Sequence, residues 1–148
     1  MMSFGQSISK ELLIDAPVSK VWAALTVPGQ MKQWMAETEI EIISDWKTGE
    51  PFIIKGPWYK TGFENKGTLL AFEPQHIFSY SHLSSLSRLQ DIPENYTVLE
   101  FRLTGKDDQT RLRLDISNFP TEAIYRHFAF YWNVALEQLR KFVVSIEE

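Results

Sequence analysis

The stretch from Pro120 to Ile146 constrains the fold more than any other part of the sequence. After Pro120 it contains neither Gly nor Pro, and its apolar residues recur at spacings of three and four. This spacing is typical of an amphipathic α-helix, which at 1.5 Å per residue would be about 40 Å long. The apolar positions form two adjacent rows: Ile124, Phe128, Tyr131, Ala135, Leu139, Phe142 and Ile146, and beside them Tyr125, Trp132, Leu136 and Val143. So wide a stripe predicts a helix that is deeply embedded on one side.

Much of the sequence before this helix alternates in the manner of antiparallel β-strands. The clearest pair is residues 96–104 and 110–117, in which apolar side chains take every second position on either side of a turn at Gly105. Weaker strand patterns cover residues 8–14, 39–44, 51–58, 67–73 and 76–83. The charged positions of the clear pair predict a solvent-exposed face with cross-strand ion pairs, formed by Glu100, Arg102, Arg111, Arg113 and Asp115.

Two short helices interrupt the strand pattern early in the chain. Val18, Val21, Trp22 and Leu25 are spaced for one apolar helix face, and Asp15 is expected to be the N-cap of this helix. After Pro28 and Gly29, the residues Met31, Trp34 and Met35 predict a second helix. A polar stretch with Pro93, residues 84–95, is long for a connection between strands and favours either a binding loop or a mobile surface loop.

The order of these elements predicts an α+β fold in a single domain spanning residues 1–148. A sheet of six to seven strands must cover one face, and only the final helix is long and apolar enough to do so. One helix is about 10–12 Å wide, so a curved sheet wrapped around it leaves space that side chains fill or that remains a pocket. The aromatic content, 14% with 5 Trp, 5 Tyr and 10 Phe, suits either outcome.

Composition excludes several functions. The sequence has no Cys, which rules out disulfides, thiolate zinc sites and cysteine nucleophiles. The formal net charge of −4 argues against nucleic-acid binding through bulk charge. No apolar run approaches the roughly 20 residues of a membrane span, and the first residues lack the features of a signal peptide. We therefore expect a cytoplasmic monomer or homodimer without a metal site or a cofactor.

Four features of the sequence occur together in a familiar order: residues 14–25 (IDAPVSKVWAAL) followed by Trp34, residues 67–74 (GTLLAFEP), residues 110–114 (TRLRL) and the spacing of Trp132, Leu136 and Leu139. With these features the chain resembles the START-like (SRPBCC, helix-grip) superfamily, and within it the branch named for the activator of the heat-shock-protein-90 ATPase. The resemblance runs from about Ile8 to Phe142. It implies a helix-grip fold, in which a curved antiparallel sheet of six to seven strands wraps around the long C-terminal helix.

Aromatic residues are the main candidates for a binding site between the sheet and the helix. Phe78, Tyr80 and His82 share one face of their strand by alternation, so that Tyr80 and His82 would be polar groups on a pocket wall. His76 and His82 lie roughly 20 Å apart on one predicted strand and cannot share a metal. The candidate ligand-binding residues are Trp34, Trp58, Phe78, Tyr80, His82, Phe101, Phe128 and Trp132.

Three functions follow as hypotheses. The first is non-enzymatic binding of a small hydrophobic molecule, such as a lipid-like or aromatic compound. The second, implied by the resemblance, is a module that interacts with a heat-shock chaperone. The third is a cyclase- or isomerase-type enzyme that uses Tyr80 and His82 in the same cavity, although no nucleophile or nucleotide-binding motif is present.

Overall fold

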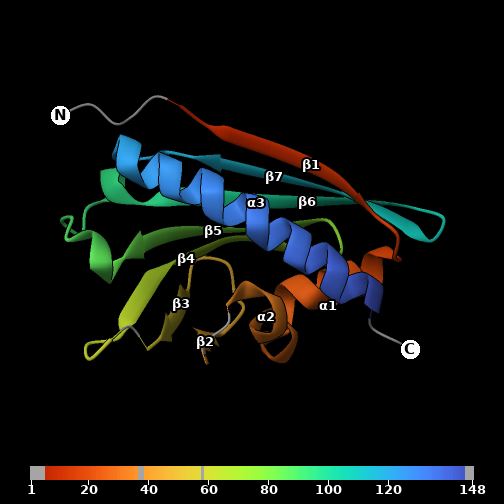
Figure 1. The fold of residues 1–148 in the computed structure, drawn as a ribbon, viewed down its shortest axis with the longest axis horizontal. Helices are drawn as coiled ribbons and strands as arrows, with labels where there is room; N and C mark the ends of the chain where they lie inside the picture. Colours follow the sequence, from red (N-terminus) through yellow and green to blue (C-terminus); the bar gives the residue numbers. More distant parts are fainter. Residues whose placement is uncertain (1–5, 37–38, 58, 146–148) are drawn as a thin grey trace.

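Seven antiparallel strands and one long helix build the molecule, in the order expected from the sequence (Figure 1). The computed structural model describes residues 6–36, 39–57 and 59–145. The strands are β1 (Ile8–Ile14), β2 (Glu41–Ser44), β3 (Pro51–Gly56), β4 (Phe63–Glu73), β5 (Ile77–Ser84), β6 (Thr97–Lys106) and β7 (Gln109–Ser117). The helices are α1 (Val18–Thr26), α2 (Pro28–Met35) and α3 (Glu122–Ser145), with two 3-10 turns, η1 (Ser85–Ser87) and η2 (Pro93–Asn95). The predicted α+β class is therefore confirmed.

All seven strands belong to one sheet with the order β1-β7-β6-β5-β4-β3-β2. The strands from β2 to β7 follow one another as a meander, whereas β1 joins the far edge by pairing with β7, where Ile8 lies opposite Ile116. The sheet curves, and α3 crosses it diagonally on its inner side, with α1 and α2 near one end of α3 (Figure 1). This is the arrangement predicted from the broad sheet and the single long helix.

The apolar stripe of α3 lies against the sheet as expected. Phe128, Trp132, Leu136, Leu139 and Val143 are all buried. The helix begins one residue after Thr121, whose hydroxyl accepts a hydrogen bond from the Ile124 amide at 3.2 Å, which satisfies one of the free N–H groups of the first turn. Within the described ranges, no helix has the length and apolarity needed to cross a membrane.

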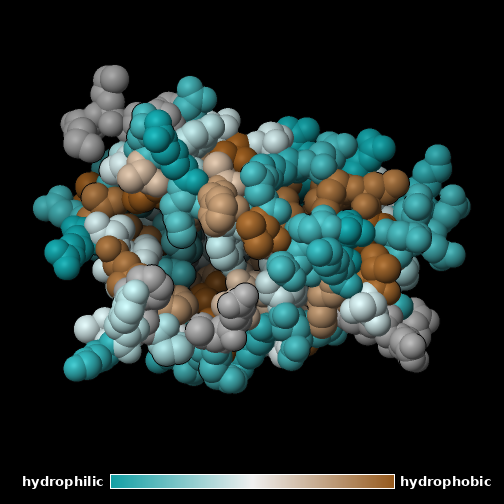
Figure 2. Space-filling view, viewed as in Figure 1, coloured by the Kyte–Doolittle hydropathy of each residue, from teal (hydrophilic) through white to brown (hydrophobic). Residues whose placement is uncertain are grey.

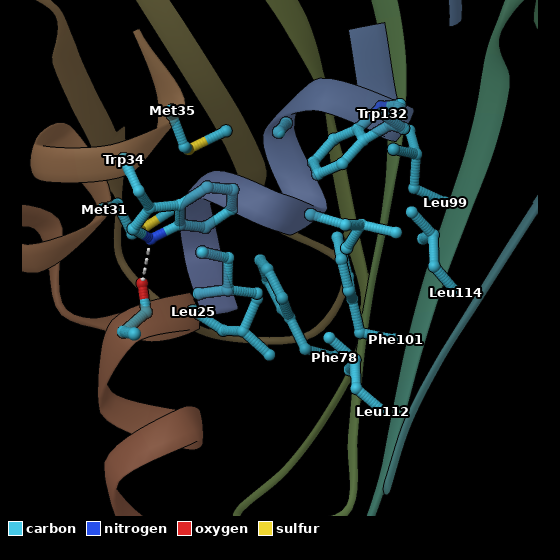
Figure 3. Packing of buried hydrophobic residues seen from close by; sticks show 14 of the residues in the cluster. Leu25, Met31, Trp34, Met35, Phe78, Leu99, Phe101, Leu112, Leu114 and Trp132 are labelled. Carbon is cyan, nitrogen blue, oxygen red and sulfur yellow. Dashed lines mark hydrogen bonds between the residues drawn. The ribbon is translucent and has the colours of Figure 1, made fainter. Parts of the chain in front are cut away.

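Around Trp132, near the middle of α3, the core is densely packed (Figure 3). Phe78 and Phe101, neighbours on β5 and β6, are each 1% exposed, and their rings stack with centroids 5.7 Å apart. Phe101 also meets Trp132 of α3 edge-on at 5.5 Å. Trp34 of α2 lies 6.2 Å from Trp132, and its indole N–H donates a 2.8 Å hydrogen bond to the Ala24 carbonyl. Through these contacts the aromatic cluster packs both short helices against α3 and the sheet.

The expected N-cap of the first helix was wrong. Pro17, not Asp15, is the N-cap residue of α1, and no side chain caps this helix. The fixed backbone of Pro17 allows the turn into the helix without a capping side chain. The start of α1 is instead held by Thr110 of β7, whose buried hydroxyl donates a 2.8 Å hydrogen bond to the Ala16 carbonyl.

We expect Thr110→Val to lower the free energy of unfolding by about 1–2 kcal/mol, because the Ala16 carbonyl would stay buried without its donor. Chemical denaturation of both proteins measures this difference. Thr104→Val, at an exposed position on β6, is the matched control and should change stability by less than about 0.5 kcal/mol. Equal effects of the two substitutions would contradict a structural role for the Thr110 hydroxyl.

Several boundaries and pairings also differ from expectation. β4 begins at Phe63, four residues before the predicted start at residue 67, and His76 lies in the β4–β5 turn and not on a strand. Two of the expected cross-strand ion pairs run along a single strand: Arg102 with Glu100 at 2.8 Å and Arg113 with Asp115 at 2.9 Å. On a strand, residues i and i+2 share a face, which allows these oppositely charged side chains to meet.

Candidate functional site

A cavity of about 570 Å³ separates the first half of α3 from strands β3 to β6. Figure 2 shows the hollow beside α3, with hydrophobic residues at its floor. Its volume lies in the range of about 300–1,000 Å³ that is common for small-molecule sites. The space arises because α3 covers only part of the width of the curved sheet, and the short helices fill the other end.

The walls of the cavity are mainly apolar. Most of these side chains come from the sheet and α3, and α2 adds one at the edge. The buried members are Met35, Ile40, Ile54, Leu83, Leu99, Phe128 and Trp132. Leu86 and Ala123 lie exposed at the mouth. Walls of this kind favour apolar guests, because each 100 Å² of apolar surface removed from water contributes about 2.5 kcal/mol.

Some polar groups on the wall already have partners. The Tyr131 hydroxyl donates to the Met35 carbonyl at 2.5 Å and joins α3 to α2. The Ser87 hydroxyl donates to the Ser84 carbonyl at 2.7 Å, while the Asn95 amide donates to the Gln90 carbonyl at 2.9 Å. These bonds shape the wall and leave their donors occupied.

Four further polar side chains on the wall form what we call the polar patch: Asn65, Tyr80, His82 and Thr97. They come from β4, β5 and β6, and His82 lies directly opposite Thr97 in the β5–β6 register. Within the described residues, none of these four side chains forms a hydrogen bond with another residue. The imidazole of His82 meets Phe128 edge-on, with ring centroids 5.1 Å apart.

Burial keeps the two ionisable members of the polar patch uncharged near neutral pH. Desolvation lowers the pKa of His82 to about 4; a hydrogen bond to its own backbone opposes this shift, and a smaller electrostatic contribution from His127 adds to it. Burial also raises the pKa of Tyr80 far above its usual value, with a further contribution from Tyr131. The patch thus presents a phenol, a neutral imidazole, a hydroxyl and an amide.

The loop between β5 and β6 forms one end of the cavity, through Leu86, Ser87 and Asn95. Its position is fixed by Asp91, which pairs with Lys66 of β4 at 2.5 Å and accepts a 2.6 Å hydrogen bond from the Tyr96 hydroxyl. These bonds, first that from Lys66, hold the pKa of Asp91 below its ordinary value. Residues of the 84–95 stretch therefore contribute to the candidate site, as one of its two interpretations predicted.

The eight predicted site residues fall into three groups. Tyr80, His82, Phe128 and Trp132 line the cavity. Trp34, Phe78 and Phe101 do not; they belong to the packed aromatic cluster, in which Trp34 of α2 and Phe78 and Phe101 of the sheet surround Trp132 of α3. Trp58 lies outside the described residues.

Sequence reasoning missed several wall residues, among them Asn65, Thr97, His127 and Tyr131. Thr97 did carry a signal, because it alternates in phase with the inward-facing Leu99 of β6. Asn65 carried none, because it was placed outside the predicted strand.

A second, shallower depression adjoins the cavity and shares Ile40 and Phe63 with it. Its rim is charged and solvent-exposed, with Lys55 and Glu41 3.9 Å apart. No cluster of three or more His, Asp or Glu side chains that could hold a metal ion occurs in the parts of the chain that the structure describes.

The fold and the internal cavity together define a START-like (SRPBCC) protein. The family model described as "Activator of Hsp90 ATPase homolog 1-like protein" matches residues 15–143. The chain belongs to this family. No protein of curated function matches it.

Solved structures of the same fold support this placement. The chain is similar to ChR145 from Cytophaga hutchinsonii, with 37% identity, 96% of each chain covered and a TM-score of 0.81. MLL2253 from Mesorhizobium loti is 24% identical, with 97% of this chain and 100% of that chain covered and a TM-score of 0.79. The Aha1 dimer from Colwellia psychrerythraea is 22% identical, with 93% and 96% covered and a TM-score of 0.71. The last two comparisons concern the fold alone.

Proposed function

We propose that the chain binds a small, largely apolar molecule of lipid-like or aromatic kind in the cavity between α3 and the sheet, and that it performs no chemistry on it. The observation that carries the proposal is the cavity of about 570 Å³ with its apolar wall. A filled interior would have left no room for an organic guest. The ligand would contact Tyr80, His82, Phe128 and Trp132, which line the cavity.

Apolar compounds that fit the cavity are expected to raise the melting temperature. A ligand at 100 times its dissociation constant stabilises the folded state by about 2.7 kcal/mol, which corresponds to about 5–10 °C for a chain of this length. A thermal-shift screen with polycyclic aromatics and long-chain alcohols measures this effect. Trp132 lies on the wall, so its fluorescence should change in the same titrations.

A variant that blocks the mouth of the cavity tests whether the ligand binds inside it. Ala123→Trp adds a large ring at the exposed rim on α3 and should abolish the thermal shifts. Gln138→Trp adds the same ring at an exposed position of the same helix that does not line the cavity, and should leave the shifts intact. The proposal fails if no compound shifts the melting temperature, or if the shifts survive Ala123→Trp but not Gln138→Trp.

A second candidate function is a module that interacts with a heat-shock chaperone of the Hsp90 class. The family match favours it. Its test is the ATPase rate of such a chaperone with and without the purified chain. Stimulation that Ala123→Trp leaves unchanged would assign the activity to the surface of the chain and not to the cavity. The cytoplasmic location and the monomeric or dimeric state remain predictions.

A further inference from the structure

The polar patch offers hydrogen-bonding groups that the protein itself leaves unused. Tyr80 is 3% exposed and Thr97 is 1% exposed. Every side-chain nitrogen or oxygen of the described residues that is sealed from the surroundings has a hydrogen-bond partner. The hydroxyls of Tyr80 and Thr97 have none within the described part of the chain, so they open into the cavity that both residues line. Buried hydroxyls are rarely left in this state without a ligand or water to meet them.

The groups of the patch lie at neighbouring positions on three adjacent strands, with Tyr80, His82 and Thr97 nearest to one another. His82 and Thr97 are directly opposite each other on adjacent strands, a placement that brings side chains on one face to about 5 Å. Tyr80 precedes His82 by two residues and shares its face, and Asn65 lies opposite Ser84, the next residue of that face. The patch is therefore a continuous polar area across three strands, with Leu99, Ile54 and Trp132 around it.

The part of the lining that the structure describes carries no carboxylate, ammonium or guanidinium group. None of the described residues on the cavity wall is Asp, Glu, Lys or Arg. The imidazole of His82 is held in its neutral form by burial. A carboxylate or ammonium group that entered the cavity would lose its hydration and meet no opposite charge among these wall residues, which is strongly unfavourable. A hydroxyl or carbonyl group would instead replace its water contacts with the groups of the patch.

We propose that the ligand is an uncharged molecule, apolar over most of its surface, that places one hydroxyl or carbonyl group against the polar patch. This proposal rests on the proposed function and adds the chemical class of the ligand. Tyr80 and Thr97 act as its specificity-determining residues, because their hydroxyls can both donate and accept. Alcohols, phenols and ketones with a large apolar body belong to this class; fatty-acid anions do not.

Three probes with the same apolar body test the class: 1-hydroxypyrene, 1-methylpyrene and pyrene-1-carboxylate. Their affinities are measured at neutral pH by fluorescence titration of the full chain. We expect 1-hydroxypyrene to bind about tenfold more tightly than 1-methylpyrene, because a hydrogen bond to the patch is typically worth a factor of about three to ten and two partners are available. Pyrene-1-carboxylate should bind at least about a hundredfold more weakly than 1-hydroxypyrene.

Isosteric variants test whether the polar patch causes the preference for 1-hydroxypyrene over 1-methylpyrene. Tyr80→Phe and Thr97→Val each remove one hydroxyl without removing volume, and together they should bring the ratio of the 1-hydroxypyrene and 1-methylpyrene affinities close to one. Tyr125→Phe is the matched control: it removes a phenol from α3 away from the cavity and should leave the ratio unchanged. Thermal unfolding of each variant without probe checks that the fold is intact.

The outcomes separate this proposal from the one on which it rests. If none of the three probes binds, binding of apolar guests itself is contradicted. If 1-hydroxypyrene and 1-methylpyrene bind equally well, or if the preference survives both isosteric substitutions, the cavity binds apolar guests but the polar patch does not select them. Tightest binding of pyrene-1-carboxylate would overturn the assignment of an uncharged ligand.

Discussion

Phe101→Ala is expected to lower the free energy of unfolding by about 3–5 kcal/mol. The ring is 1% exposed and packs between Phe78, at 5.7 Å, and Trp132, at 5.5 Å. Its removal takes apolar contacts from β5, β6 and α3 at once and leaves a void that the rigid neighbouring rings cannot fill. Urea denaturation followed by circular dichroism measures the loss.

The matched control is Phe130→Ala, because Phe130 lies on the outer face of α3 and is 73% exposed. This substitution should change the free energy of unfolding by less than about 0.5 kcal/mol. A loss below about 1 kcal/mol for Phe101→Ala would mean that the region around Phe101 is as open as the cavity beside it. The division of the interior into a packed half and a hollow half would then be wrong.

The second large effect is a loss of stability on acidification that depends on His82. Burial lowers the pKa of this residue to about 4 in the folded protein, whereas an unfolded chain titrates near 6.5. Between these values the unfolded state binds a proton that the folded state excludes, so the free energy of unfolding rises with pH. Well above pH 6.5, both states are neutral and the dependence disappears. Between pH 7.5 and pH 4.5 we expect His82 to account for a loss of about 2–3 kcal/mol.

The measurement compares parent and His82→Phe by urea denaturation at both pH values. Other groups also titrate over this range, so the informative quantity is the difference between the two proteins. His82→Phe keeps a ring against Phe128 and should lose about 2–3 kcal/mol less than the parent on acidification. His76→Gln, which removes an exposed histidine from the β4–β5 turn, is the control. Identical losses in parent and His82→Phe would show that the imidazole is hydrated in the folded state.

The architecture could be predicted because its signals are periodic. The spacing of Phe128, Trp132, Leu136 and Leu139 indicates a helix, and the alternation of Leu99, Phe101 and Leu103 indicates a strand, whatever the rest of the chain does. The inward face of β5 followed from the same alternation. Boundaries were less certain: Asp15 has the composition of an N-cap, but Pro17 takes that position, because capping depends on the exact approach of the chain.

The site could be predicted only in part, since alternation tells which face of a strand a residue occupies but not what covers it. Phe78 and Tyr80 lie two residues apart on the same face of β5, yet Phe78 is in the packed cluster and Tyr80 lines the cavity. The difference is set by where α3 crosses the sheet, which depends on contacts between segments distant in sequence. For the same reason the sequence predicted Phe101 and Trp34 as lining residues, whereas the cavity wall does not include them.

The partnership of β1 with β7 has a consequence for how the chain reaches its native state. The hairpins from β2 to β7 join strands that are neighbours in sequence, so they can form early. In contrast, β1 cannot pair until β7 is available, and β7 is synthesised after all the other strands. Until β7 is available, the growing chain carries an unpaired first strand. The apolar face of the sheet also stays exposed until α3 covers it. During synthesis, β1 can therefore pair with the wrong strand. Any delay before residue 116 emerges from the ribosome lengthens the time in which such mispairing can occur.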